Sequence, residues 1–515
     1  MTDTAKTLYV KDFGAIGDGK TDDAYAIHMA LEALKAAPAG SRLVFEKDAT
    51  YYYKENCCGQ LPVIYFRYQE GKTIKGDNST LLLGGRSHYY ADIENSKDIT
   101  IEGMNFNYGE YKPAFHADFE SIDAENGTAV MIADRDIHLE NGQIYDRSMA
   151  REFFACIKHT KARWHMYVDS YEMLDREARR FKVTFRKQDK RTMDRLKLDF
   201  LPSHGLVMMM PFTGNIVERA FSIHEDTDFT MRNVNIYSAQ RHVFSLQYNS
   251  GNFLFENVKQ IRHPDDMDLW YVSWADSYHL LNNRAHYHFL NCFNEWNYDD
   301  VFNISVSLLV PRVVYAPNEG DLFLAETRGA FAKILPGDSV TVVSRSTGRY
   351  QRTEIAEVIK QEGSVNHVRF KDNIEWLEGK KDGEVVKHAV RDDAYATEDL
   401  CVYIDPLQGT DMLIENCNFD GTFRARNDIT FVNTRFYNRR FWLGNETLWE
   451  GSLPRNILFK DCVFEHDDHN EVYWHVCSHW NGKGTAHAEN IVFENCKGID
   501  LELMEYSPED EIIIK

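Results

Sequence analysis

A short strand–turn–strand pattern recurs along this chain and limits the folds that it can adopt. Each copy has a short β-favouring run, a polar turn residue that is mostly Asn, and a second short run, as in the stretch NILFKDCVF at 456–464. The copies start at Asp98, Asp228, Asn252, His286, Asp411, Asp428, Asn456 and Asn490. Repeats of this length cannot bury their apolar faces alone, so they stack into a solenoid. The starts at 228, 252 and 286 are 24 and 34 residues apart, which indicates loops of variable length on a regular core.

The pattern is absent from two stretches, 110–220 and 308–405. The second contains GDSVTVV and YQRTEIAEV, short alternating strands with glycine-containing turns that are typical of a small antiparallel barrel or sandwich. We therefore expect two inserted β domains. The predicted organisation is N-terminal coils and cap (1–110), inserted domain one (111–220), central coils (221–307), inserted barrel two (308–405) and C-terminal coils (406–515).

The N-terminal segment combines VKDFGA at 10–15 with GDGKTDDA at 17–24, followed by a helix expected over residues 22–36. Residues 14–21 also fit the P-loop expression, but Asp22 and Asp23 at the helix N-terminus would repel a triphosphate. The two motifs resemble the opening of pectate-lyase-like right-handed β-helix proteins, in which this helix caps the first coil. Together with the repeats, the resemblance predicts an all-β fold: a right-handed parallel β-helix with an N-terminal capping helix and two inserted small antiparallel β-barrel domains.

Charge and apolar patterning exclude several functions. The net charge is −22 and no Lys/Arg-rich run occurs, so we expect no nucleic-acid partner and, without a local basic cleft, no polyanionic substrate. No stretch of about 18 apolar residues exists, so no membrane span is expected. The N-terminus as given has no signal sequence, which predicts a cytoplasmic protein, or a secreted or periplasmic one if a signal was removed.

Neither the cysteines nor the clustered acidic residues have the spacing of a metal-binding motif. Four of the nine cysteines follow Asn or Asp in the repeats, which indicates small buried side chains at one solenoid position (Cys292, Cys417, Cys462 and Cys496). The pair His466 and His469, with two Asp between them, is expected to be exposed, because its spacing matches no zinc pattern. We predict no metal and no cofactor. Asp265, Asp266 and Asp268 are expected in a solvated loop, or else in the lining of the cleft. Arg241 and His242 are expected in a structural salt bridge, or else near the substrate.

The stretch 270–303 holds the residues of chemical interest. Asp276 precedes Asp299 by 23 residues, about one coil, and residues one coil apart lie roughly 4.8 Å apart. Asp276, Asp299 and Asp300 would then share one site, and a carboxylic acid beside a carboxylate suits glycosidic bond cleavage. Neighbouring Asp299 and Asp300 point to opposite faces of a regular strand, so both reach the site only at a bend or strand end. The alternative is that these residues only form turns and ladders.

Two segments carry a narrower resemblance. ADSYHL at 275–280 and YDDVFN at 298–303 resemble the Gly-Asp-Gly-x-His-Phe and Asp-Asp-Ala-x-Asn segments of glycoside hydrolase family 110. That family consists of inverting exo-α-1,3-galactosidases with two β-barrels inserted in a right-handed β-helix. Ser277 and Tyr278 depart from the family pattern and make the wall beside Asp276 bulkier, and ISVS replaces Val-His-Gly after Asn303, which allows another sugar.

The resemblance implies that Asp276, Asp299 and Asp300 supply the catalytic acid and base. It does not assign which of them is the acid and which is the base. His279 and Asn303 are expected to hold sugar hydroxyls. Trp270, Trp274 and Trp296 are candidates for stacking on a sugar face, with core packing as the alternative. The predicted function is therefore an inverting exo-α-galactosidase acting on an oligosaccharide or glycan, with possible homo-oligomerisation.

Three other functions remain open. The chain could be a glycosidase of different specificity or a polysaccharide lyase or galacturonase, although the Gly-His-Gly and Arg-Ile-Lys motifs of polygalacturonases do not occur. It could also be a non-catalytic glycan-binding β-helix, such as a trimeric tailspike, which needs no carboxylates one coil apart.

Overall fold

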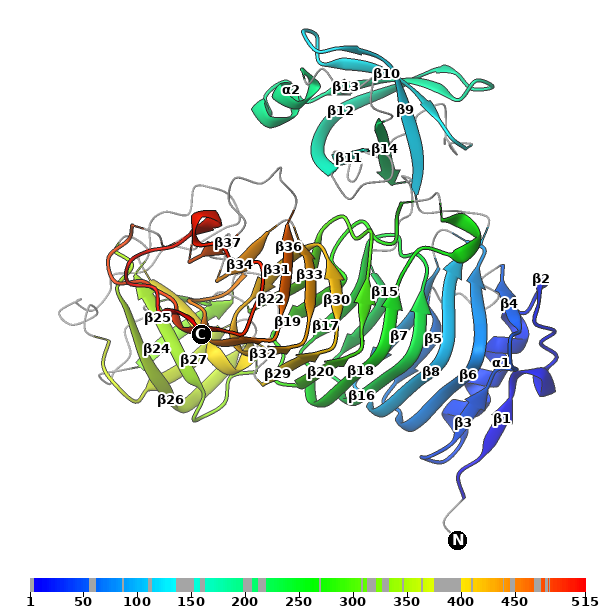
Figure 1. Cartoon of the computed structure of the whole chain (residues 1–515). Coiled ribbons are helices and arrows are strands. Elements are labelled where there is room, and N and C mark those ends of the chain that lie inside the picture. The colour runs from blue at the N-terminus through cyan, green and yellow to red at the C-terminus, as the bar shows by residue number, and fades with distance from the viewer. Residues whose placement is uncertain are drawn as a thin grey trace.

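The chain winds into a parallel β-helix with two barrels attached (Figure 1). The computed structural model describes residues 4–54, 62–85, 88–109, 114–135, 152–157, 163–197, 206–211, 219–267, 270–306, 309–312, 321–326, 333–344, 347–362, 365–374, 400–408, 411–438, 440–444, 450–466, 474–477, 480 and 482–515. Sheet A, the 18-stranded sheet, contains β1 (Thr7–Tyr9), β2 (Asp18–Asp22), β3 (Arg42–Val44), β4 (Thr50–Tyr53), β6 (Glu70–Leu83), β8 (Lys97–Tyr108), β16 (Thr227–Ile236), β18 (Ser250–Gln260), β20 (His286–Leu290), β21 (Phe293–Asn294), β29 (Met412–Glu415), β30 (Asn418–Asp420), β32 (Asn427–Val432), β33 (Arg435–Asn438), β35 (Arg455–Lys460), β36 (Val463–His466), β38 (Glu489–Glu494) and β40 (Ile512–Ile514).

The second face of the solenoid is sheet B, a ten-stranded parallel sheet. Its strands, in order, are β5 (Pro62–Arg67), β7 (Tyr89–Glu94), β15 (Arg219–His224), β17 (His242–Gln247), β19 (Tyr278–Leu281), β22 (Asp300–Ser305), β31 (Thr422–Ala425), β34 (Phe441–Leu443), β37 (Trp474–Val476) and β39 (Met504–Glu505). Each strand pairs in parallel with the strand of the next coil, for example β19 with β22. Sheet B therefore lines up one side chain from every coil in straight rows.

The two inserted barrels interrupt the solenoid where the repeats are missing. The first barrel closes between β8 and β15 from six antiparallel strands, β9 (Ala114–Asp123), β10 (Thr128–Ala133), β11 (Glu152–Ile157), β12 (Arg163–Asp175), β13 (Arg180–Phe185) and β14 (Leu206–Pro211), with α2 (Lys190–Leu196). The second closes between β22 and β29 from β23 (Leu309–Arg312), β24 (Asp321–Glu326), β25 (Ser339–Ser344), β26 (Tyr350–Glu362), β27 (Val365–Phe370) and β28 (Leu400–Ile404). The predicted fold class, a β-helix with two inserted barrels, is confirmed.

The backbone conformation explains why the turn residue of the repeat is Asn or Asp. The residues at this position adopt positive φ angles of 46–55°, namely Asn233, Asn257, Asn291, Asn416, Asn433, Asp461 and Asn495. Asn and Asp tolerate the left-handed conformation better than other residues with a side chain. Their amides also stack, since Asn257 Nδ2 donates to Asn233 Oδ1 at 2.8 Å. The repeat therefore encodes a bend and a hydrogen-bonded ladder together.

The interior is a stack of aromatic rings contributed by equivalent repeat positions. Phe431 and Phe459 stack at 4.6 Å between centroids, and Phe459 stacks on Phe493 at 4.9 Å. Cys292, Cys417 and Cys462 are buried as expected, whereas Cys496 is half-buried near the C-terminal end. Pairing between parallel strands places the side chains of equivalent repeat positions directly above one another, which explains why similar residues recur at one position.

The N-terminal helix α1 (Ala24–Ala36) closes the first coil and begins two residues later than expected. Its apolar face joins the core of the solenoid through Ala24, Ile27, Ala30, Leu31 and Leu34. The preceding Asp23 is 2% exposed, and its carboxylate accepts hydrogen bonds from the backbone N–H groups of Ile16 (2.7 Å) and Gly17 (3.1 Å). Asp23 thus occupies N–H groups of the loop that a phosphate would need, which supports rejecting the P-loop match.

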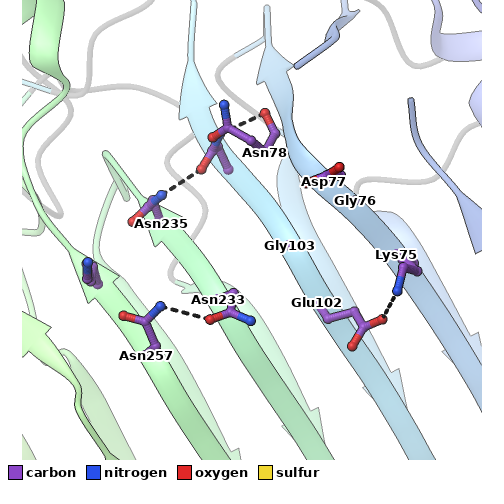
Figure 2. Close-up of a pocket in the computed structure, with 11 residues that line it drawn as sticks. Lys75, Gly76, Asp77, Asn78, Glu102, Gly103, Asn233, Asn235 and Asn257 are labelled. Atoms are coloured by element: carbon purple, nitrogen blue, oxygen red, sulfur yellow. Dashed lines mark hydrogen bonds and ion pairs between the residues drawn. The ribbon is translucent and has the colours of Figure 1, made fainter. Parts of the chain in front are cut away.

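A polar groove of about 400 Å³ opens on sheet A across β6, β8, β16 and β18, where the asparagine ladder is interrupted (Figure 2). Gly103 stands at the ladder position, and its Cβ would lie only 2.3 Å from the Gly76 carbonyl oxygen. Between Lys75 and Ser79 the register of β6 against β8 also shifts. Neighbouring amides bond to one another, as Asn235 Nδ2 does to Asn105 Oδ1 at 2.8 Å. The close backbone approach and the ladder explain this groove.

No helix in the described part of the chain is both long and apolar enough to cross a membrane.

Candidate active site

The outer face of sheet B aligns the candidate residues in one row. Ser245 on β17 pairs with His279 on β19, His279 with Asn303 on β22, and Asn303 with Arg424 on β31. Adjacent strands are about 4.8 Å apart, so His279, Asn303 and Arg424 project from consecutive coils. Asn303 is 6% exposed, and its Oδ1 has no hydrogen-bond partner among the described residues. A buried amide oxygen of this kind is a candidate acceptor for a substrate hydroxyl.

The three predicted carboxylates come together at the start of β19 and β22. One oxygen each of Asp276, Asp299 and Asp300 lies within 4.8 Å of the other two. Asp276 and Asp300 are 3% and 2% exposed, whereas Asp299 is exposed. The cluster therefore has a buried pair and one carboxylate facing solvent.

A hydrogen-bonded turn lets neighbouring Asp299 and Asp300 reach the same site. Asn297 Oδ1 accepts from the Asp299 N–H at 3.0 Å, and Asn297 Nδ2 donates to the Asp300 carbonyl at 2.7 Å. The Ser277 N–H also donates to the Asp300 carbonyl at 2.8 Å, which joins the turn to the coil of Asp276. The two aspartates stand at the entry to β22 and not within a regular strand, which is the strand-end arrangement that the sequence required.

Two histidines hold Asp276 in its ionised form. His279 Nδ1 lies 2.6 Å from Asp276 Oδ2, and His242 Nδ1 lies 3.6 Å from the same oxygen. Burial by itself raises the pKa of Asp276, but the hydrogen bond to His279 and the charges of His242, His279 and Arg424 outweigh it and lower the pKa to about 2. Asp276 is therefore a carboxylate across the pH range in which most enzymes work.

Asp300 has the opposite electrostatic environment. Burial raises the pKa of Asp300 well above its usual range; Arg424 lowers it, and the nearby Asp299, Asp276 and Glu450 raise it further. Arg424 Nε lies 2.6 Å from Asp300 Oδ2, but the Arg424 guanidinium also pairs with Glu450. The pKa of one buried carboxyl is thus lowered and that of its neighbour raised, the usual way in which a site separates a base from an acid.

His242, Asp276 and His279 also form a group that could hold a metal, with one ligand atom each within 4.8 Å of the others. Zinc–nitrogen and zinc–oxygen bonds are about 2.0–2.2 Å, so two ligands at a tetrahedral angle lie more than 3 Å apart. The 2.6 Å contact between His279 Nδ1 and Asp276 Oδ2 is shorter than that. It fits a direct imidazole–carboxylate hydrogen bond.

The three tryptophans occupy different environments. Trp270 and Trp296 are 6% and 5% exposed and stack on each other at 5.5 Å in a small cluster with Tyr298. The backbone N–H of Trp270 donates to His116 Nε2 of the first barrel at 3.2 Å. These two rings pack the junction between barrel and solenoid. Trp274 stacks on Tyr298 at 5.7 Å but keeps intermediate exposure, so its ring is the more accessible one.

Several residues of the site escaped sequence reasoning. His242 was assigned mainly to a structural salt bridge, but its position at the start of β17, one coil before Asp276, was a signal for the site. For Arg424 and Glu450 the sequence offers no such signal, because the second barrel separates them in sequence from Asp300. Asp265 and Asp266 belong to the 3₁₀ turn η2 (Pro264–Asp266), where Asp266 lies 3.7 Å from Arg135 of the first barrel. Asp268 and the segment 467–469, which includes His469, lie outside the described residues.

Comparison with known proteins gives only distant similarities. No family model and no curated protein matches the chain. Among solved structures it is similar to the A-module of a mannuronan C-5 epimerase from Azotobacter vinelandii, with 9% identity over 98% of this chain and 99% of the other and a TM-score of 0.38. A surface adhesin of Streptococcus pneumoniae matches with 14% identity, coverage of 99% and 77%, and a TM-score of 0.36.

A GH87 α-1,3-glucanase from Streptomyces thermodiastaticus matches with 9% identity, coverage of 99% and 67%, and a TM-score of 0.37. Similarities this low transfer no activity to this chain, whose β-helix is defined by its own strand pairings.

Proposed function

We propose that this protein is a glycoside hydrolase in which Asp300 is the general acid and Asp276 the ionised partner. The supporting observation is the pair of buried carboxylates within 4.8 Å whose pKa values are shifted in opposite directions. Glycosidic cleavage needs a protonated carboxyl at the leaving oxygen and a carboxylate at the sugar. Asp300 gives its proton to the leaving oxygen, and Asp276 acts on the anomeric side.

The surrounding groups suit a neutral sugar. Asn303 offers a buried acceptor, and His279 stands beside it in the sheet B row. The Arg424 charge is matched by Glu450, so it favours a neutral glycan over the uronate substrate of a lyase or galacturonase. The resemblance of 275–280 and 298–303 to glycoside hydrolase family 110 points to a terminal α-1,3-linked galactose, and we propose that unit as the substrate.

The stereochemical outcome has two candidates. The resemblance implies inversion, in which Asp276, with the exposed Asp299, activates water on the face opposite the leaving group. Inverting enzymes usually hold their carboxyl groups roughly 6.5–9.5 Å apart, and retaining enzymes about 5–5.5 Å apart. One oxygen of Asp276 lies within 4.8 Å of one oxygen of Asp300, and this limit on two single atoms is compatible with either separation. In the retaining alternative, Asp276 attacks the anomeric carbon and water later releases the sugar.

Proton NMR of the reaction on an α-1,3-galactobiose-type substrate tests the proposal. The wild type, Asp300→Asn and the control Asp411→Asn, which removes an exposed carboxylate on sheet A, are compared. β-Galactose appearing first indicates inversion, and α-galactose appearing first indicates retention; both require Asp300→Asn to be nearly inactive while the control is active. If the wild type releases no sugar from this substrate, the galactose assignment is wrong, and if a panel of aryl glycosides is also untouched, the hydrolase proposal is wrong.

A further inference from the structure

Glu450 and Arg424 form an ion-pair chain that ends on Asp300. Arg424 projects from β31, next to β22, and its Nε lies 2.6 Å from Asp300 Oδ2. Its Nη1 pairs with Glu450 Oε2. All three side chains are largely buried, with exposures of 3% for Asp300, 14% for Arg424 and 19% for Glu450. One guanidinium therefore serves two carboxylates in a poorly solvated place, where charge interactions are strong.

The register of the strands produces this contact. Asp300 pairs with Thr422 and Phe302 with Phe423, so the register shifts by one residue between β22 and β31. Asn303 then pairs with Arg424. Arg424 lies two residues along β31 from the position opposite Asp300, and its side chain reaches back to the Asp300 carboxyl group.

Glu450 is itself fixed from two sides through its backbone. Its carbonyl oxygen accepts from the Val306 N–H at 3.2 Å and from Arg426 Nε at 3.2 Å. Arg426 is fully buried, and its Nη1 also donates to the carbonyls of Ala425 and Gly444. The Glu450 backbone is thus anchored between the end of β22 and the end of β31, and its carboxylate pairs with the Nη1 group of Arg424.

The arrangement has a defined consequence for Asp300. The charged groups around Asp300 include Asp299 beside it, Asp276 before β19, Arg424 on β31 and Glu450 beyond Arg424, together with the buried Arg426 that follows β31. An arginine devoted to Asp300 alone would favour its ionised form, because an adjacent cation lowers a carboxyl pKa by roughly one to three units. A second carboxylate on the same guanidinium offsets part of that charge.

We propose that Glu450 is a positioning residue: by holding Arg424 from the other side, it lets Arg424 orient the Asp300 carboxyl group without removing its proton. The inference rests on the proposed function, since it assigns to Glu450 the control of the general acid. Glu450 then sets the alkaline limit of activity, although it lies far along the chain from the cluster of Asp276, Asp299 and Asp300.

The first test is the pH dependence of kcat/KM for wild type and Glu450→Gln. Loss of the Glu450 charge leaves Arg424 to act on Asp300 alone, so the alkaline limb shifts to lower pH by about one unit. Glu256→Gln, which removes a carboxylate paired with Arg232 on sheet A, is expected to leave the profile unchanged. An alkaline limb that does not move in Glu450→Gln overturns the proposal.

The second test needs no substrate and separates this inference from the proposed function. The ¹³C carboxyl resonance of Asp300 is identified by its loss in Asp300→Asn and titrated in wild type, Glu450→Gln and Glu450→Asp. We expect the Asp300 titration to move to lower pH in Glu450→Gln and to move less in Glu450→Asp, which keeps the charge. If both variants titrate like wild type, the inference is wrong; if the shift occurs but no glycoside is cleaved, only the assignment of Asp300 as a glycosidase acid is wrong. Should Glu450→Gln fail to fold, Glu450→Ala, which also removes the charge, takes its place: a shift of the Asp300 titration to lower pH supports the inference, and an unchanged titration overturns it.

Discussion

The carboxylates of Asp276 and Asp300 approach within 4.8 Å of each other from adjacent coils, yet one has its pKa lowered and the other has it raised. The difference comes from their partners. Asp276 faces two imidazoles, with His279 at 2.6 Å, whereas the Arg424 guanidinium beside Asp300 also pairs with Glu450. Two negative charges this close repel each other, so the ionised Asp276 itself contributes to the raised pKa of Asp300.

Replacement of either carboxylate is expected to lower kcat by roughly 10²–10⁴-fold with little change in KM, as is usual for loss of a general acid or base. The two variants differ in rescue. Asp300→Asn recovers activity on an aryl glycoside with a good leaving group, because such a bond needs no acid. Asp276→Asn recovers with added azide, which replaces the missing base or nucleophile. Steady-state kinetics with both substrates and azide measures this, and the opposite pattern of rescue means that the two roles are exchanged.

His279→Gln is expected to move the acid limb of kcat/KM to higher pH. The hydrogen bond from His279 lowers the pKa of Asp276, so its loss raises that pKa and Asp276 becomes protonated at a less acidic pH. The pH–rate profile is the measurement, and His286→Gln, which breaks an exposed histidine–aspartate pair on sheet A, is the matched control. A profile that loses rate equally at every pH contradicts this electrostatic role.

Trp274 and Trp270 are expected to respond differently to replacement by alanine. Trp270 is buried in the barrel–solenoid junction, so its loss costs about 3–5 kcal/mol in the free energy of unfolding. Trp274 is partly exposed, and loss of its ring is expected to raise KM about fivefold, as for an aromatic contact of about 1 kcal/mol. Denaturant unfolding and substrate titration measure the two effects. An unchanged KM in Trp274→Ala means that the ring only packs on Tyr298.

Asp226 is expected to destabilise the protein as the pH rises. It is 2% exposed, and burial, opposed by the hydrogen bond from the Ser96 N–H, raises its pKa from 3.8 to about 7. Between these pH values the folded chain keeps this proton and the unfolded chain has lost it, so the free energy of unfolding falls with pH and the loss is complete above about 7.

Asp226→Asn cannot ionise and is expected to be more stabilising at pH 8 than at pH 4, by at least about 1 kcal/mol. Urea unfolding at both pH values measures the difference. A stability change that is the same at the two pH values shows that Asp226 carries no such penalty.

The repeats predicted the solenoid because the residues that determine each coil lie close together in the sequence. Asn or Asp in the left-handed turn and the alternating apolar positions act within one coil, and the same physics repeats at each. Asp276 and the pair Asp299 and Asp300 could be placed together for the same reason, since no insertion separates them. The orientation of Asp299 and Asp300 was not predictable, because it depends on the Asn297 side chain and the turn that it holds.

The sequence by itself therefore determined the β-helix, its cap, its two interruptions and the meeting of three carboxylates. Only the tertiary structure decided which carboxyl has its pKa raised and which tryptophans pack. Besides His279, three residues after Asp276, those properties depend on burial and on partners from other coils and from the first barrel. These partners are His242 beside Asp276, Arg424 and Glu450 beside Asp300, and His116 against Trp270. Arg424 and Glu450 follow the second barrel in the chain, so no spacing in the sequence links them to Asp300, and only the stacking of the strands brings these charges together.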